Sequence, residues 1–320
     1  MGRSTKISIT ASCYNEEGNI EELYRRCRNV LAKHPQYDYE FILEDNCSTD
    51  RTREILRGIA AKDKHFKVIL NSRNFGHIRS PFNAFLSGTG DAVVTMCSDL
   101  QEPPELIDDF IQAWEKGSKV VVGIRSGTRA SWTLELLRKA YYTLLSKAAE
   151  GGRLIPSFTG FGLYDRAFVN ALKLYNEPYP YFRGLVSEVG FQRTEIPFVQ
   201  EKRMQGITKN NFFTLYDMAV TGFVNHTKLP LRLAVFTGFL LAAGSLVIAL
   251  IYLILKLIRW DTFELGLAPI MIGLFFFAAV QLICIGIIGE YIGAIWTQVK
   301  NKPLVIEEER INFDEQPPNS

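Results

Sequence analysis

The sequence has little of what zinc sites, disulfide scaffolds and nucleic-acid-binding proteins require. Its five cysteines form no Cys-x-x-Cys pair, and only four histidines occur in 320 residues. A zinc site is therefore not expected, and reduced cysteines in a cytosolic domain are the default. The formal net charge of +2 is too small to indicate a nucleic-acid partner. No signal peptide precedes the first strand-like segment, which favours a cytosolic location for the polar part of the chain.

Two long uncharged runs are present instead, at residues 233–255 and 265–289. As helices these runs would extend roughly 34 and 37 Å, enough to cross a hydrocarbon layer of about 30 Å. We therefore predict two transmembrane helices, 233–258 and 265–291, that form a hairpin in the inner or plasma membrane. Buried core helices are the alternative interpretation.

Basic residues flank the outer ends of this hairpin, in agreement with the positive-inside rule: Lys228, Arg232, Lys300 and Lys302. The link between the runs also holds Lys256 and Arg259, which weakens that signal. Small residues at Gly286, Gly289 and Gly293 offer a seam for helix association, and lipid-facing glycine is the alternative. A homo-oligomer is therefore one expectation.

The first 205 residues alternate strand-like and helix-like segments, which predicts a mostly parallel α/β sheet with helices on its faces. Expected strands lie at residues 7–11, 41–43, 68–70, 92–96 and 120–124, and expected helices at 20–31, 48–61, 106–114 and 134–149. Ser48 or Thr49 would cap the second helix. Residues 206–232 predict an amphipathic juxtamembrane segment, with a packed amphipathic helix as the alternative. Residues 292–320 predict a cytosolic tail that is partly disordered from Pro303.

One strand-like run ends in Asp99, Leu100 and Gln101, followed by Glu102 and two prolines. An Asp at the carboxyl end of a buried strand lies where open α/β sheets bind ligands. In an extended chain Asp99 and Gln101 would point to the same side and could share one hard cation. A helix N-terminus capped by an acid is the alternative interpretation.

Polar residues also follow three other expected strands. Tyr14 offers a flat face for a base, and Glu16 offers an acceptor for a ring N–H or a ribose hydroxyl. Asp45 again lies at the end of a strand, and Arg73 follows the third strand. Because the carboxyl ends of parallel strands share one edge of a sheet, these side chains are expected to converge on one ligand.

The series Tyr-Asn-Glu-Glu, Glu-Asp-Asn-Cys-Ser-Thr-Asp, Asn-Phe-Gly-His and Asp-Leu-Gln-Glu-Pro-Pro-Glu resembles the family-2 inverting glycosyltransferases of the GT-A fold. Within them the chain is similar to the branch that loads sugars onto polyprenyl phosphates, which includes dolichol-phosphate mannose synthases and bacterial undecaprenyl-phosphate glucosyltransferases. Further matches are Phe161-Gly162-Leu163-Tyr164-Asp165-Arg166 and the segment from Arg203 to Lys209. The resemblance covers residues 7 to 307, and it implies a GT-A nucleotide-diphospho-sugar transferase fold.

The resemblance also implies roles for particular residues. Asp99 and Gln101 would be catalytic and would hold Mg²⁺ or Mn²⁺ against the donor diphosphate. The nucleotide sugar would be bound by Ala11, Tyr14, Glu16, Asp45, Arg73, Asn74, Ser98 and Asp99. Cationic side chains would bind the acceptor phosphate, namely Arg125, Arg129, Arg138, Arg203 and Lys209. A solvated basic face attracted to anionic lipid is the alternative for these cations.

The chain departs from the family pattern where carboxylates are usual. Cys97 replaces the first Asp of an Asp-x-Asp pair, and a thiol is a poor ligand for a hard ion. Asn46 replaces a second Asp, Ser12 a proline, and Gly160 an Asp proposed to act near the sugar. A phosphate-monoester nucleophile has a second pKa of about 6 and is mostly dianionic at pH 7. Displacement by such a nucleophile does not need a strong general base.

The sequence thus predicts inverting transfer of a single hexose, with glucose and a UDP-linked donor favoured, to polyprenyl phosphate at the cytosolic membrane face. Two alternatives stay open. A polymer-forming synthase of the same superfamily would need more spans and a Gln-x-x-Arg-Trp motif, which the sequence does not contain. A catalytically weak membrane scaffold that binds sugar nucleotides would explain the lost carboxylates.

Overall fold

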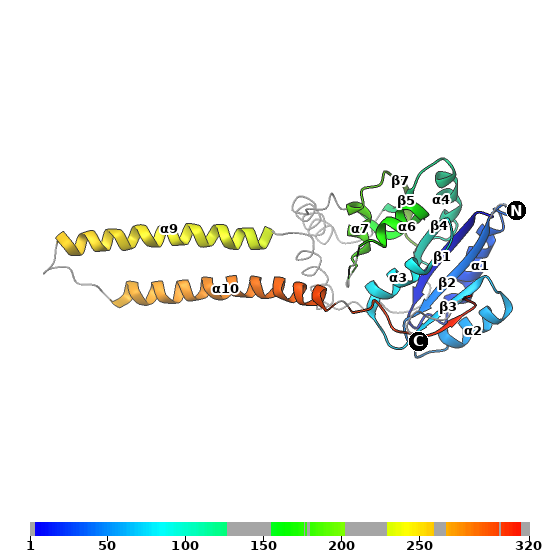
Figure 1. Ribbon diagram of the computed structural model, residues 1–320, viewed down its shortest axis with the longest axis horizontal. Coiled ribbons are helices and arrows are strands. Elements are labelled where there is room, and N and C mark those ends of the chain that lie inside the picture. Colours follow the sequence, from blue (N-terminus) through cyan, green and yellow to red (C-terminus); the bar gives the residue numbers. More distant parts are fainter. Residues whose placement is uncertain are drawn as a thin grey trace. The chain divides into compact units, whose positions relative to one another are not determined.

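The computed structural model describes residues 4–126, 155–175, 177, 180–201, 229–258, 267–300 and 302–314. The chain divides into two compact units, which are described here separately. One is an α/β unit that contains the described residues up to 201 and those from 302. The other contains the two long helices α9 and α10 (Figure 1). The expected helix at 134–149 and most of the expected juxtamembrane segment 206–232 lie outside the described residues.

The α/β unit is built on one mixed sheet with the strand order β7-β5-β6-β4-β1-β2-β3-β8. The strands are β1 (Lys6–Cys13), β2 (Asp38–Asp45), β3 (Phe66–Asn71), β4 (Ala92–Cys97), β5 (Val120–Ser126), β6 (Phe158–Asp165), β7 (Arg193–Val199) and β8 (Glu307–Ile311). Only β6 and β8 run opposite to the other strands of this sheet. The mostly parallel α/β sheet expected from the sequence is therefore confirmed, as is each of its five expected strands.

Helices cover both faces of the sheet, which explains why the central strands β1 and β4 are buried along most of their length. They are α1 (Ile20–Leu31), α2 (Thr52–Lys62), α3 (Gly76–Ser87), α4 (Leu106–Glu115), α6 (Arg166–Leu172) and α7 (Phe182–Glu188). Successive strand residues alternate between two cores. In β4, Val94 joins the core under α1, α2 and α4, whereas Val93 joins the core under α3, α6 and α7.

Two details of the helices differ from the expectation. Neither Ser48 nor Thr49 caps α2, because that helix begins at Thr52 and its N-cap residue Arg51 makes no side-chain cap hydrogen bond. The sequence pattern also did not predict α3, which contains Pro81. The apolar face of α3 becomes evident only once Phe82 and Phe85 are seen to be buried against the sheet.

The segment that follows α10 returns to the sheet. Strand β8 pairs antiparallel with the edge strand β3. Arg53 and Arg57 of α2 form ion pairs with Glu308 at 3.0 Å and Glu309 at 2.6 Å, respectively. Residues 303–314 of the tail that we expected to be partly disordered are therefore ordered, and the residues after 314 lie outside those that the structure describes. Backbone pairing with an open sheet edge, which no local composition reveals, orders this segment.

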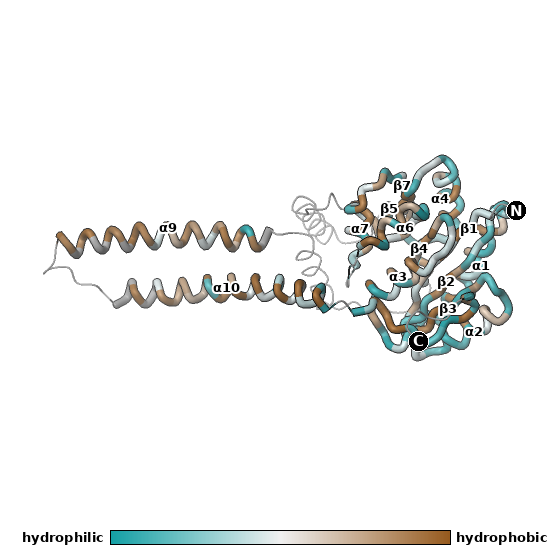
Figure 2. The backbone as a smooth tube through the Cα atoms, viewed as in Figure 1, coloured by the Kyte–Doolittle hydropathy of each residue, from teal (hydrophilic) through white to brown (hydrophobic). Residues whose placement is uncertain are grey.

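The second unit consists of α9 (Leu229–Ile258) and α10 (Leu267–Val299). Both helices are long and apolar enough to cross a membrane, and Figure 2 shows their mostly hydrophobic residues. Within the structure, neither candidate span is buried. Their apolar side chains are exposed around the helix circumference, for example Phe239 and Phe275. Such exposure would be very unfavourable in water, which supports a lipid environment. Open space surrounds Gly286, Gly289 and Gly293, so the expected association through them stays a prediction.

Candidate active site

The carboxyl ends of four neighbouring parallel strands define the candidate site. Strands β4, β1, β2 and β3 are adjacent and run in one direction, so the loops that follow them open at the same edge of the sheet (Figure 1). These are the loops that contain the predicted donor-binding residues. The structure thus places the four loops together at the edge where open α/β sheets bind ligands.

Side-chain hydroxyls hold the loop after β1 against the loop after β2. The N–H of Asn15 donates to Ser48 Oγ at 2.9 Å, and the N–H of Glu16 donates to Thr52 Oγ1 at 3.0 Å. Asn15 has a φ of +57°, a left-handed conformation that Asn tolerates better than most residues. Tyr14 and Glu16, the predicted nucleoside contacts, therefore lie on a loop whose backbone is fixed before any ligand binds.

Asp45 is completely buried within the unit. Its carboxylate accepts a hydrogen bond from the N–H of Ser48 and one from Arg53 Nε at 2.7 Å. Arg53 also donates to the carbonyl oxygen of Asn71, so the carboxylate joins β2, α2 and β3. The structure shows Asp45 as half of a buried ion pair, and its predicted contact with the nucleoside stays a prediction.

Asn46 connects the loops after β2 and β3. Its Nδ2 donates to Asn74 Oδ1 at 3.0 Å and to the carbonyl of Gly76 at 3.1 Å, while its Oδ1 accepts from the N–H of Phe75 at 2.8 Å. Nearby, the Arg73 guanidinium stacks over the Phe75 ring at 3.9 Å. The amide that replaces the usual carboxylate therefore has a structural task that sequence reasoning missed.

The loop after β4 does not have the expected extended shape. Leu100 has a φ of +59° and is fully buried, and the N–H of Gln101 donates to Asp99 Oδ1 at 3.2 Å. The argument that Asp99 and Gln101 share a side through strand alternation is therefore wrong. The chain turns here because the Leu100 side chain enters the core. Asp99 and Gln101 remain neighbours through a local hydrogen bond, at the cost of a strained backbone at the site.

Glu102 lies buried behind this loop and contacts the backbone of Cys97, whose own side chain is exposed. The Glu102 carboxyl accepts from the N–H of Cys97 at 2.7 Å and from Thr159 Oγ1 at 2.6 Å. Burial raises the pKa of Glu102, and the charge of Glu102 raises the pKa of the Cys97 thiol well above its usual value. Cys97 is thus held as a neutral thiol, unsuited to a hard metal ion. The role of Glu102 was not anticipated from the sequence.

The oxygen ligands in the loop after β4 suit a divalent ion that the substrate would also help to bind. Asp99 supplies a carboxylate and Gln101 an amide oxygen, both hard ligands. Among the described residues no group of three or more His, Cys, Asp or Glu side chains is placed to bind a metal. Mg²⁺ commonly takes one or two protein oxygens and completes its shell with waters and substrate phosphates. The chemistry of these two residues suits that arrangement.

The remaining predicted residues fall into three groups. Ala11 is buried in β1, and Ser98 is buried with its hydroxyl donating to the carbonyl of Ser12 at 2.9 Å. Arg125 Nη1 donates to Gln200 Oε1 at 2.8 Å, a contact that the sequence did not suggest. The other predicted acceptor-phosphate ligands lie outside the described residues: Arg129, Arg138, Arg203 and Lys209.

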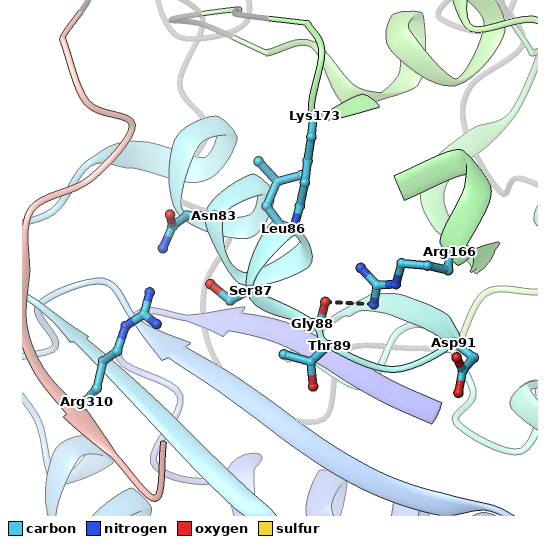
Figure 3. A pocket seen from close by; sticks show the side chains of 9 residues that line it. All are labelled: Asn83, Leu86, Ser87, Gly88, Thr89, Asp91, Arg166, Lys173 and Arg310. Carbon is cyan, nitrogen blue, oxygen red and sulfur yellow. Dashed lines mark hydrogen bonds between the residues drawn. The ribbon is translucent and has the colours of Figure 1, made fainter. Parts of the chain in front are cut away.

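A cavity of about 550 Å³ lies away from these loops. Its lining includes Thr89 and Asp91, which precede β4, and Arg166, whose guanidinium donates to the carbonyl of Gly88 at 2.8 Å (Figure 3). The amino end of β4 is opposite the edge that carries Asp99. None of the predicted site residues is among those that line this cavity, so it is distinct from the candidate active site.

The model of glycosyl transferase family 2 matches residues 8–172, which include all four loops of the site. This chain belongs to glycosyl transferase family 2. An uncharacterized glycosyltransferase of Synechocystis sp. is 34% identical over 303 residues, which cover 94% of each chain. A prophage-derived bactoprenol glucosyl transferase of Shigella flexneri is 29% identical over 301 residues, 94% of this chain and 97% of that protein. A putative glycosyltransferase of Bacillus subtilis is 32% identical over 93% of this chain and 89% of its own length.

Among solved structures, a mannosyltransferase from Pyrobaculum calidifontis in complex with GDP-Man and Mn²⁺ is 13% identical. It aligns with a TM-score of 0.48 over 94% of this chain and 88% of its own. The family 2 assignment and the sheet described above confirm the predicted GT-A fold class. The protein is a glycosyltransferase.

Proposed function

We propose that this glycosyltransferase transfers a single glucose from UDP-glucose, with inversion, to a polyprenyl phosphate at the cytosolic face of the membrane. The observation that carries the proposal is the extent of the similarity to bactoprenol glucosyl transferases. It spans 94% of this chain, so the aligned region takes in the apolar helices as well as the α/β unit. A transferase whose acceptor is a membrane lipid needs both parts.

The reaction is a single displacement at the anomeric carbon. An oxygen of the acceptor phosphate forms a bond to that carbon, and the bond from the carbon to the donor diphosphate breaks, with the electron pair leaving on the diphosphate. No proton has to move, because the attacking phosphate is already anionic at neutral pH. Gly160, at a φ of +110°, supplies no carboxylate that could act as a base, in agreement with such a nucleophile.

Asp99 and Gln101 act on the leaving group. A divalent ion, when bound, stabilises the charge that develops on the departing diphosphate. Asp99 would contribute the carboxylate and Gln101 the amide oxygen that hold it. The fixed loops of Tyr14 and Asn46 would orient the nucleoside and keep the diphosphate in line with the acceptor. Preorganised groups of this kind need little rearrangement during the reaction.

The membrane helices would bring the catalytic unit to its acceptor. A polyprenyl phosphate presents its charged head at the bilayer surface, and Arg125, Arg129, Arg138, Arg203 and Lys209 are the proposed ligands of that head. Arginine binds phosphate through two parallel hydrogen bonds, which would also fix its orientation. The hairpin would keep the α/β unit on the cytosolic side.

The test is transfer of label from a nucleotide sugar into lipid. The purified full-length protein is incubated with undecaprenyl phosphate, Mg²⁺ and each of several radiolabelled UDP- and GDP-sugars, and the lipid is extracted into organic solvent. We expect label in the organic phase with UDP-glucose, carried by a product with one sugar. Nucleotide binding without labelled lipid would instead favour the scaffold, and a product with several sugars would favour the polymer-forming synthase.

A further inference from the structure

Gln200 connects two residues that belong to different halves of the proposed site. Arg125 Nη1 donates to Gln200 Oε1 at 2.8 Å, and Gln200 Nε2 donates to Gln101 Oε1 at 2.9 Å. A guanidinium group can only donate hydrogen bonds, so Arg125 determines the donor-to-acceptor direction of these two bonds. Gln200 must turn its oxygen toward Arg125 and its nitrogen toward Gln101. Gln101 must therefore accept this bond through its oxygen, the atom proposed to bind the metal, which leaves that oxygen one further lone pair for the ion.

The backbone around Gln200 is held on both sides. The N–H of Glu201 donates to the carbonyl of Gln101 at 3.0 Å. Strands β5 and β7 pair in parallel up to their carboxyl ends, and Ser126 Oγ donates to the carbonyl of Phe198 at 2.9 Å. The backbone on both sides of the link is thus fixed, so the side chains of Arg125, Gln200 and Gln101 are the parts that a ligand would order.

The two ends of this link have different proposed ligands. Gln101 would face the donor diphosphate, and Arg125 would bind the acceptor phosphate. In the sequence, Arg129 and Arg138 follow Arg125, and Arg203 follows Gln200. The link therefore joins the donor loop to two residues, Arg125 and Gln200, that are close in sequence to the other proposed acceptor ligands.

We propose that Gln200 is a positioning residue that couples binding of the acceptor phosphate to binding of the donor diphosphate. The inference rests on the proposed function. Guanidinium carries five N–H donors, so a phosphate can bind Arg125 while Nη1 keeps its bond to Gln200. A phosphate that orders Arg125 also orders Gln200 and the oxygen of Gln101. The conformational entropy of these side chains is then lost when the first ligand binds, so the second ligand binds more tightly.

The experiment measures this coupling by binding. The affinity of the full-length protein for UDP with Mg²⁺ is determined by calorimetry, without and with saturating short-chain prenyl phosphate. Inorganic phosphate, in a separate arm, distinguishes the charged head from the lipid chain. We expect the acceptor to tighten UDP binding by about fivefold or more in the wild type, within the usual range of coupling between sites.

Two substitutions test the role of Gln200 against a matched control. Gln200→Ala removes both hydrogen bonds, and Gln200→Glu keeps an acceptor for Arg125 but cannot donate to Gln101. Both variants should bring the ratio of UDP affinities close to one. Gln112→Ala, which removes an exposed side chain that bonds Asp108 on α4, should keep the wild-type ratio. Thermal melting confirms that each variant is folded.

The outcomes separate the inference from the proposed function. A wild-type ratio of one, or an unchanged ratio in both Gln200 variants, would overturn the coupling role even if lipid is glucosylated. Failure of the wild type to label lipid, with a ratio that still depends on Gln200, would overturn the proposed reaction and leave the coupling intact.

Discussion

Asn46 and Asn74 are joined side chain to side chain, with Asn46 Nδ2 donating to Asn74 Oδ1 at 3.0 Å. The contact ties the loop after β2 to the loop after β3, and both loops carry residues predicted to bind the nucleotide. At the position where the sequence pattern led us to expect a carboxylate, this protein has an amide that can donate as well as accept. Asn46 therefore supports both loops through donated hydrogen bonds that a carboxylate could not make.

Asn46→Asp should lower both the stability of the protein and its affinity for the donor. The carboxylate would lose two donated hydrogen bonds and would face the oxygen of Asn74 and the carbonyl of Gly76. We expect destabilisation of about 1–3 kcal/mol, typical for a buried polar group left without its partner, and a higher KM for the donor. Thermal melting and donor titration measure the two effects. Asn29→Asp, on the exposed face of α1, is the control and should change neither.

Asp99→Asn should slow transfer strongly while the fold is kept. The amide oxygen can still accept the N–H of Gln101, but the charge that would balance the divalent ion is gone. We expect the rate of transfer to fall by about 10²–10³-fold, the usual cost of removing one group that stabilises developing charge. The melting temperature should not change. Asp109→Asn, an exposed residue of α4, should transfer normally. Full turnover after thorough chelation of divalent ions would contradict the proposed role of both Asp99 and Gln101.

Glu44 should make stability depend on pH in an unusual direction. Burial raises the pKa of this carboxyl to about 8, although Asn71 and Asn83 donate hydrogen bonds to it. In the unfolded chain its pKa is near 4.3. Between these values the folded state binds more protons, so the contribution is complete at low pH and is lost as the pH rises toward 8.

Glu44→Gln should therefore flatten the pH profile between about pH 5 and 8. Melting temperatures across this range measure the effect in the full-length protein. Glu54→Gln, on the exposed side of α2, should leave the profile as it is in the wild type. A wild-type profile that rises through the same interval would show that Glu44 is ionised in the folded protein.

Arg53 and Arg57 provide a paired test of burial. Both lie on α2 and both contact β8, but Arg53 also pairs with the fully buried carboxylate of Asp45. Arg53→Ala should cost about 3–5 kcal/mol, because it leaves a buried charge without its partner. Arg57→Ala breaks an exposed pair with Glu309 and should cost at most about 1 kcal/mol. Chemical unfolding measures both, and equal losses would show that the burial of Asp45 is not what makes its ion pair important.

Much of the fold was accessible from the sequence because local patterns encode it. Apolar runs predicted the strands at 7–11 and 92–96, and the helix expected at 20–31 has the observed bounds of α1. The length of the two uncharged runs predicted the two apolar helices. These signals arise from neighbouring residues, whose alternation or spacing is the same in the sequence as in the folded chain.

The features that sequence reasoning missed depend on residues far apart in the chain. Strand β8 meets β3 across more than two hundred residues, and Gln200 meets Gln101 across about one hundred. The turn at Leu100 followed from a place in the core for its side chain, and the burial of Asp45 followed from the position of Arg53.

The sequence by itself determined five of the eight strands in the described sheet, the helices α1, α2 and α4, the two long apolar helices, the family and the set of polar residues at the strand ends. Only the tertiary structure decided which of those residues bind one another. The physical reason is that the role of a polar side chain depends on its hydrogen-bond and ion-pair partners. Partners are chosen by packing and hydrogen-bond geometry in three dimensions, which no local pattern contains.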